Sequence, residues 1–166
     1  MESAHLRYRP VAPADLDAFH ALVQDEHVRR YLTDGRLRPR EWSAARIGES
    51  AELFVRRGVG LWLAHERTTG APVGFCGFLE VPAQHPEPQL LYALRERFTG
   101  RGWATEMART VIAHARTQPG FAEVVATVDG VNVASLRVLE KLGFERIATI
   151  GGSFGPTFVL RLPPGR

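Results

Sequence analysis

The spacing of apolar residues alternates along the chain between the period of a helix and that of a strand. Apolar residues three and four apart, such as Leu16, Phe19 and Val23, indicate helices, whereas short apolar runs between turn residues indicate strands. Glycine and proline end most of these segments. In chain order the predicted elements are a strand at 5–10, a helix opening at 13, a further helical turn at 28–32, a helix at 42–57, strands at 60–67, 72–81 and 89–95, a helix at 103–118, a strand at 121–128, a helix at 132–142 and strands at 144–150 and 156–162.

This order predicts a mixed α/β (α+β) fold with flanking helices and a mostly antiparallel central sheet. Residues 60–67 and 72–81 have the form of a hairpin, and three prolines between residues 82 and 88 predict a loop. A helix separates the strands at 89–95 and 121–128, so that pair is expected to be parallel, with a right-handed crossover. The 166 residues, 45% of them hydrophobic, are enough for one core and too few for a second full domain, so residues 1–166 are expected to form a single domain.

Charge and composition argue against several classes of protein. Lys and Arg number 21 against 18 Asp and Glu, and the surplus is dispersed over the second half of the chain, which argues against nucleic-acid binding. No segment approaches the roughly 18 apolar residues of a membrane span, so we expect a soluble, cytoplasmic protein. Cys76 is the only cysteine and the six histidines lack ligand spacing, so we predict no metal, and Cys76 is expected to be a core thiol rather than a nucleophile.

The segment after the strand at 89–95 has the composition of an anion site. Gly100 and Gly102 allow the backbone to approach a ligand, and the first amides of the helix behind them present the positive end of its dipole, which favours phosphate. The segment is neither a dinucleotide fingerprint, which needs a third glycine, nor a nucleotide P-loop, which needs Gly-Lys-Ser/Thr. Two glycines alone also fit a tight turn between strand and helix.

Three segments together resemble the GNAT family of acetyl-CoA-dependent N-acetyltransferases. Arg97-x-x-Gly100-x-Gly102, followed by Trp103-Ala104, is similar to the cofactor motif of that family. Asn132-x-x-Ser135 with residues 139–144, and the early segment 25–32, resemble the branch of ribosomal-protein-alanine N-acetyltransferases. The resemblance covers nearly the whole chain and implies a GNAT-like domain with a splayed parallel strand pair, but it leaves the acceptor open.

The resemblance also implies where acetyl-CoA binds. The pantetheine arm would lie along a splayed strand, backbone groups of the glycine loop would hold the pyrophosphate, and Arg97 or Arg101 would add a charge-assisted fork. Asn132 and Ser135 would lie beside the thiol end. The implied cofactor-binding residues are Leu91, Tyr92, Ala93, Leu94, Arg97, Thr99, Gly100, Arg101, Gly102, Trp103, Ala104, Asn132, Ser135 and Lys141.

Acetyl transfer to an amine needs a proton for the departing thiolate and a base for the amine. Ser135 is the candidate acid, although Asn132 and Ser135 also fit the simple cap of a helix. Relatives commonly carry a glutamate where this chain has Gln89, which cannot accept a proton. Glu87 is the candidate base, acting through a water, and its alternative is a solvated loop carboxylate.

The leading hypothesis is therefore direct acetyl transfer to a primary amine, either a protein N-terminus or a small molecule. The alternative is a non-catalytic acyl-CoA-binding module, which Gln89 favours. Trp42, Phe54 and Trp62 are expected to line the acceptor pocket or to pack in the core, and such folds also form homodimers. Asp25, Glu26 and Glu80 would suit a polycationic acceptor if they converged in space.

Overall fold

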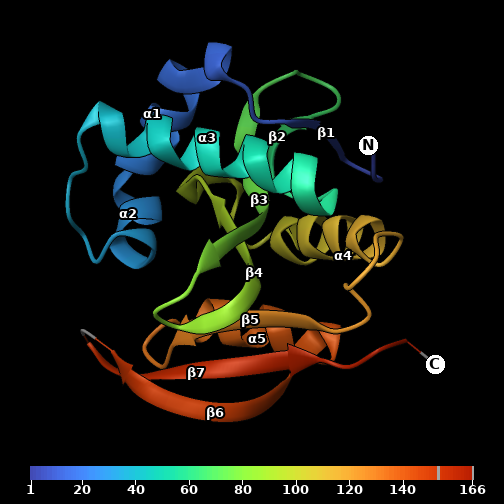
Figure 1. Ribbon diagram of the computed structural model, residues 1–166. Helices are drawn as coiled ribbons and strands as arrows, with labels where there is room; N and C mark the ends of the chain where they lie inside the picture. Colours follow the sequence, from blue (N-terminus) through green and yellow to red (C-terminus); the bar gives the residue numbers. More distant parts are fainter. Residues whose placement is uncertain (153, 166) are drawn as a thin grey trace.

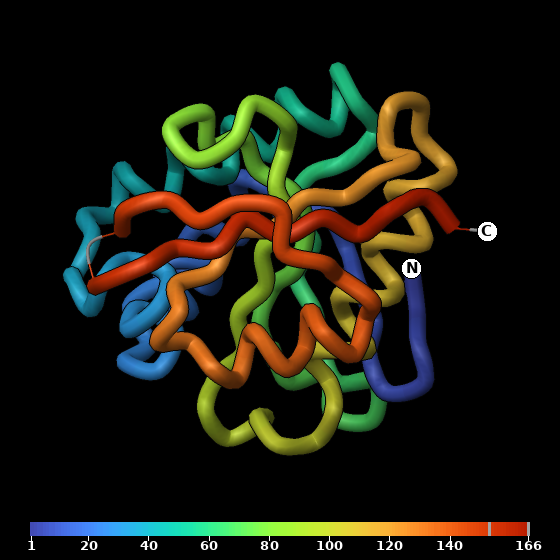
Figure 2. The backbone as a smooth tube through the Cα atoms, turned by 90° about the horizontal axis from the view of Figure 1, so that it is seen from below, coloured from blue at the N-terminus to red at the C-terminus, as the bar shows by residue number. Residues whose placement is uncertain are grey.

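A mixed sheet runs through the computed structural model, which describes residues 1–152 and 154–165 (Figure 1). Within these residues the strand order is β1-β2-β3-β4-β5-β7-β6. The β6–β7 pair crosses the end of the molecule that Figure 2 shows from below. The strands are β1 (Leu6–Pro10), β2 (Leu61–Glu66), β3 (Pro72–Val81), β4 (His85–Leu94), β5 (Val124–Asp129), β6 (Glu145–Gly152) and β7 (Gly155–Leu162).

The central strand of the sheet, β4, is parallel to its neighbour β5, and every other neighbouring pair is antiparallel. The register joins β4 to β5 at one position, Gln89 opposite Val125. On its other side β5 stays paired with β7 as far as Asp129. The parallel arrangement predicted from the sequence is thus confirmed, and the two strands part after a single register pair.

The helices cover both faces of the sheet and form two apolar clusters with it. On one face, Phe19, Ile47 and Phe75 belong to a cluster under the first three helices. On the other, Met107 and Leu139 pack with the sheet residues that include Cys76, which is fully buried as the sequence predicts. The helices are α1 (Leu16–Gln24), α2 (Glu26–Leu32), α3 (Arg40–Arg57), α4 (Trp103–Ala115) and α5 (Val133–Leu142), with short 3₁₀ turns at Pro13–Asp15 and Glu96–Phe98.

Several predicted boundaries were wrong, and the helix predicted to end at residue 118 ends at Ala115. The loop expected at 82–88 is only a turn, because β4 already begins at His85 opposite Val81. Prolines are tolerated there since β4 pairs on one side only before Gln89. The turn at 28–32 is a separate helix, α2, because Asp25 is extended and its carboxylate caps the amides of the next helix. Residues 121–123 precede β5 rather than belonging to it.

Two glycines are expected to respond oppositely to replacement by alanine. Gly48 lies inside α3, where an added Cβ would meet nothing within 4 Å, so Gly48→Ala should raise the free energy of unfolding by about 0.5–1 kcal/mol. At Gly77 an added Cβ would lie 2.0 Å from the Gly60 carbonyl oxygen on the neighbouring segment. Gly77→Ala should therefore lower the free energy of unfolding by about 1–3 kcal/mol. Denaturant unfolding measures both, and a change of the same sign at both positions would contradict this packing.

Candidate active site

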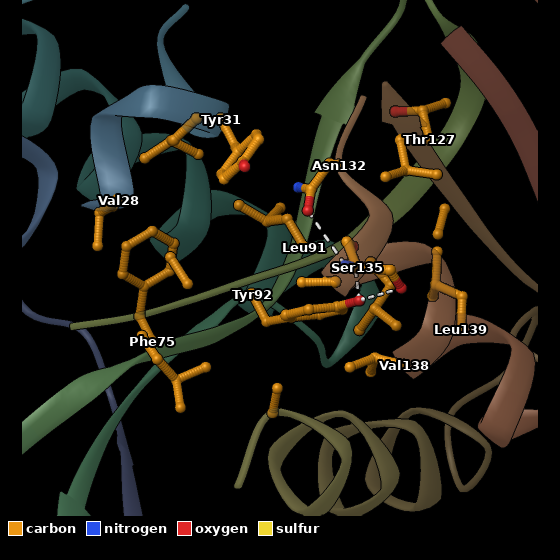
Figure 3. A pocket seen from close by; sticks show the side chains of 18 of the residues that line it. Val28, Tyr31, Phe75, Leu91, Tyr92, Thr127, Asn132, Ser135, Val138 and Leu139 are labelled. Carbon is orange, nitrogen blue, oxygen red and sulfur yellow. Dashed lines mark hydrogen bonds between the residues drawn. The ribbon is translucent and has the colours of Figure 1, made fainter. Parts of the chain in front are cut away.

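A cavity of about 620 Å³ lies where β4 and β5 part, and its lining residues come from both faces of the sheet. In Figure 3, Val28, Tyr31 and Phe75 lie to one side of Leu91 and Tyr92. Ser135, Val138 and Leu139 of α5 lie to the other side in the same view. The cavity therefore gives two ligands, one from each face, a place to meet between the strands.

The wall formed by β4 has an open backbone edge. Leu91, Tyr92, Ala93 and Leu94 all line the cavity, as the sequence comparison implied. The ladder between β4 and β5 has its single register pair at Gln89, so the following residues of β4 turn an unpaired edge towards the gap. An extended ligand with amide groups can pair with such an edge as an added strand would.

The start of α4 forms one end of the cavity. Gly102 is its N-cap with φ +79°, and Gly100 has φ +74°, both in the left-handed region that favours glycine. No side chain caps this helix, and Thr99, Gly100, Gly102, Trp103 and Ala104 line the cavity. The uncapped first-turn amides and the positive end of the dipole therefore suit an anionic group.

Two arginines, Arg97 and Arg101, were predicted to add positive charge beside this helix end. Neither Arg97 nor Arg101 lines the cavity. The Arg97 Cζ atom lies 4.7 Å from the centre of the Phe98 ring, and that of Arg101 lies 5.2 Å from the centre of Trp103. Both guanidinium groups lie over aromatic rings that themselves line the cavity, and the fork on the pyrophosphate stays a prediction.

Two cations of α5 line the cavity in their place. Lys141 was among the residues implied by the family resemblance, and Arg137 was missed. Both are exposed and lie four residues apart, which places them on one side of the helix. That i, i+4 spacing to Lys141 was the available sequence signal for Arg137.

Ser135 is held at the start of α5 by two neighbours. The Asn132 Oδ1 atom accepts a hydrogen bond from the Ser135 amide at 3.1 Å, so Asn132 is the helix cap. The Ser135 Oγ atom lies 2.7 Å from the Tyr92 hydroxyl oxygen, and this contact is drawn in Figure 3. Burial raises the pKa of Tyr92, which keeps its hydroxyl protonated. When Tyr92 donates to Oγ, the Ser135 proton is free to reach a group in the cavity.

Gln89 is a structural amide. Its side chain is 2% exposed, its Nε2 donates to the Val81 carbonyl at 3.0 Å, and its Oε1 accepts from the Thr127 hydroxyl at 2.6 Å. Both ends of the amide are thus hydrogen-bonded, and they tie β4 to the preceding turn and to β5. An amide in this setting neither accepts a proton nor carries charge.

The carboxylate at this cavity is Asp129, not Glu87. Glu87 lines a separate cavity of about 400 Å³, and its Oε2 lies 3.1 Å from a guanidinium nitrogen of Arg57. Among the described residues that line the larger cavity, Asp129 is the only Asp or Glu. It ends β5, and its Oδ1 accepts from the Thr157 hydroxyl at 2.5 Å. Its place at a strand end, three residues before Asn132, was the sequence signal that could have found it.

The remaining aromatic and acidic candidates divide between the cavity and other roles. Trp42 lines the cavity, whereas Phe54 and Trp62 pack edge to face in the core with ring centres 5.2 Å apart. Asp25 caps α2, and the Glu80 carboxylate lies 3.0 Å from Arg56. None of the three carboxylates expected for a polycationic acceptor, including Glu26, lines the cavity.

Across residues 1–152 and 154–165, no three His, Cys, Asp or Glu side chains lie close enough together to hold a metal ion. The helices in this part of the chain are too short or too polar to cross a membrane.

Comparison with known proteins identifies the family. The model of the acetyltransferase (GNAT) domain matches residues 5–145. YkkB of Bacillus subtilis (strain 168), an uncharacterized protein, is 35% identical over 138 residues, which are 80% of this chain and 76% of YkkB. The chain therefore belongs to the GNAT family of acetyltransferases.

Solved structures agree with this fold. A protein of Bordetella pertussis assigned to the GnaT family superimposes with a TM-score of 0.84 at 22% identity, over 97% of both chains. RimL, a ribosomal L7/L12 alpha-N-protein acetyltransferase solved in complex with coenzyme A, gives a TM-score of 0.79 at 17% identity, over 98% of this chain and 96% of RimL. The predicted mixed α/β fold is confirmed. At these identities the likeness extends to the fold alone.

Proposed function

We propose that the protein transfers an acetyl group from acetyl-CoA directly to a primary amine in the cavity between β4 and β5. The observation that carries the proposal is the meeting, in one cavity, of the uncapped α4 end, the Ser135–Tyr92 hydroxyl pair and the Asp129 carboxylate. Membership of the family and the coenzyme A complex of RimL support the choice of donor.

The residues on the cofactor side fit coenzyme A. The unpaired edge of β4 would hold the amide-containing pantetheine arm, and the first amides of α4 would hold the pyrophosphate. Arg137 and Lys141 add positive charge beside it. When bound, acetyl-CoA supplies the acetyl group as a thioester.

The protein's own groups then move the protons. Asp129 takes a proton from the acceptor ammonium, which leaves a neutral amine free to form the bond to the acetyl carbon. Ser135 donates its hydroxyl proton to the sulfur as the carbon–sulfur bond breaks, and Tyr92 holds the Ser135 oxygen by its hydrogen bond. Ser135 regains a proton from the acylated nitrogen or from water. The proton on Asp129 leaves to solvent, because the side chain is only half-buried.

The acceptor class is a primary amine of a small molecule or of a protein N-terminus, as in the ribosomal-protein branch. The alternative function, a module that binds acyl-CoA without turnover, was favoured by Gln89. Because Gln89 is fully used in tying β4 to its neighbours and Asp129 supplies a carboxylate, turnover is the better-supported function.

Thermal unfolding tests binding, and thiol release tests turnover. Acetyl-CoA at 100 times its dissociation constant should stabilise the fold by about 2.7 kcal/mol and raise the melting temperature accordingly. Free thiol should then appear when an amine is added. An unchanged melting temperature at millimolar acetyl-CoA overturns both functions, whereas stabilisation without thiol release from any amine leaves only the binding module.

A further inference from the structure

The wall of the cavity opposite α5 lacks the carboxylates that a polyamine would need for binding. This wall, here called the acceptor wall, consists of His27 and Tyr31 of α2, Trp42 and Arg46 of α3, and Phe75 of β3. Three of these five side chains, those of Tyr31, Trp42 and Phe75, present large aromatic rings, and Arg46 is a permanent cation. None of these five residues carries a carboxylate. Glu49, which pairs with Arg46, does not line the cavity, and Asp25 and Glu80 interact with the first amides of α2 and with Arg56.

Arg46 is held in place while part of its guanidinium group stays uncommitted. It follows Trp42 by one helical turn, and its Cζ atom lies 5.2 Å from the centre of the Trp42 ring. One terminal nitrogen pairs with Glu49, and the buried Nε has no hydrogen-bond partner among the described residues. The side chain is 31% exposed. A guanidinium has five N–H donors, so Arg46 retains donors for an anion in the cavity.

Asp129 is the one carboxylate among the described residues that line the cavity, and it comes from a different wall, at the end of β5; the cations Arg137 and Lys141 lie on α5. A second or third ammonium group on an acceptor would meet no further carboxylate among the described lining residues, and it would lie beside the Arg46 guanidinium, whose partner Glu49 does not line the cavity. An acceptor with one ammonium group, one carboxylate and an apolar body fits this cavity. Its ammonium would face Asp129, its carboxylate would face Arg46, and its apolar body would lie against the aromatic rings.

Resting on the proposed function, we infer that the acceptor is a small amine that also carries a carboxylate and an apolar side chain, an amino acid or close analogue. Arg46 binds the carboxylate, and Trp42, Tyr31 and Phe75 contact the apolar side chain. Arg46 is thus a specificity-determining residue. A polyamine and a peptide N-terminus are the competing acceptors.

A matched acceptor panel tests this inference. Leucine, methionine, phenylalanine and tryptophan are each compared with the amine that lacks the carboxylate, and with spermidine and a short alanine-starting peptide. The readouts are thiol release and the mass of the acetylated product. Wild-type kcat/KM should be roughly 10- to 100-fold higher for at least one amino acid than for its decarboxylated partner, the range expected for a hydrogen-bonded charge pair.

Variants assign the preference to Arg46. Arg46→Gln should lower the ratio of kcat/KM for the amino acid to that for its matched amine by about tenfold or more, and Arg46→Lys should fall in between. Arg56→Gln is the control on the same helix, because Arg56 is exposed, pairs with Glu80 and does not line the cavity; it should keep the wild-type ratio. Melting temperatures with and without acetyl-CoA establish that each variant is folded and binds the donor.

The outcomes separate this inference from the proposed function. A preference for spermidine or for the peptide overturns the inference while acetyl transfer stands, and so does an unchanged ratio in Arg46→Gln. Binding of acetyl-CoA without acetylation of any amine in the panel overturns the inference together with turnover. If the wild-type protein does not bind acetyl-CoA, the proposed function itself is overturned.

Discussion

Ser135→Ala is expected to lower kcat about 100-fold or more while the dissociation constant of acetyl-CoA changes by less than about threefold. The substitution removes the hydroxyl that lies 2.7 Å from Tyr92 but keeps the backbone amide that Asn132 caps, so α5 should start unchanged. Thiol-release kinetics give kcat, and calorimetric titration gives the dissociation constant.

Tyr92→Phe is the companion variant, because it keeps the ring and removes only the hydroxyl, which contacts the hydroxyl and carbonyl oxygens of Ser135. Because Tyr92 only positions Ser135, Tyr92→Phe should lower kcat less than Ser135→Ala does. If Ser135→Ala instead abolishes acetyl-CoA binding and leaves turnover per bound cofactor intact, Ser135 is a binding residue and the role of acid belongs to another group.

Asp129→Asn is expected to lower kcat/KM for the amine about 100- to 1,000-fold near neutral pH, the range of a general base. Asparagine can still accept the hydrogen bond from Thr157, so the end of β5 should be preserved. The loss should shrink as the pH rises towards the pKa of the acceptor amine, because the neutral amine then forms without help. Initial rates measured across that pH range check both effects.

Glu87→Gln is the matched control for Asp129→Asn. Glu87 pairs with Arg57 on a separate cavity, so its replacement should leave kcat/KM within about twofold of the wild type, as expected for an exposed ion pair away from the site. Equal losses in the two variants, or an effect of Asp129→Asn that does not change with pH, would remove Asp129 from the role of base.

Local sequence signals predicted the features that depend on local physics. Helical spacing and glycine ends gave α3, α4 and α5, and Gly100 and Gly102 marked the turn into α4 because their positive φ values favour glycine. The cap formed by Asn132 also follows from four adjacent residues. The parallel β4–β5 pair followed from the helix between them.

Features that depend on distant parts of the chain were missed or misplaced. Asp129 lines the cavity because β4 and β5 part after one register position, and its place at a strand end was the only local sign of this. Glu87 lies away from the larger cavity because β4 begins earlier than the prolines suggested. Arg97 and Arg101 lie in the predicted segment, but their guanidinium groups lie over the rings of Phe98 and Trp103 and do not line the cavity.

The central claim is direct transfer of acetyl from acetyl-CoA to an amine within this cavity. The most direct measurement uses acetyl-CoA labelled in its acetyl carbonyl, mixed with the protein and with the amine panel, followed by mass spectrometry of protein and products. The structure predicts label in the amide of the acetylated amine, loss of that product in Asp129→Asn, and no label on the protein when the amine is omitted. Label that remains on the protein, or product formed equally well without Asp129 and Ser135, would contradict it.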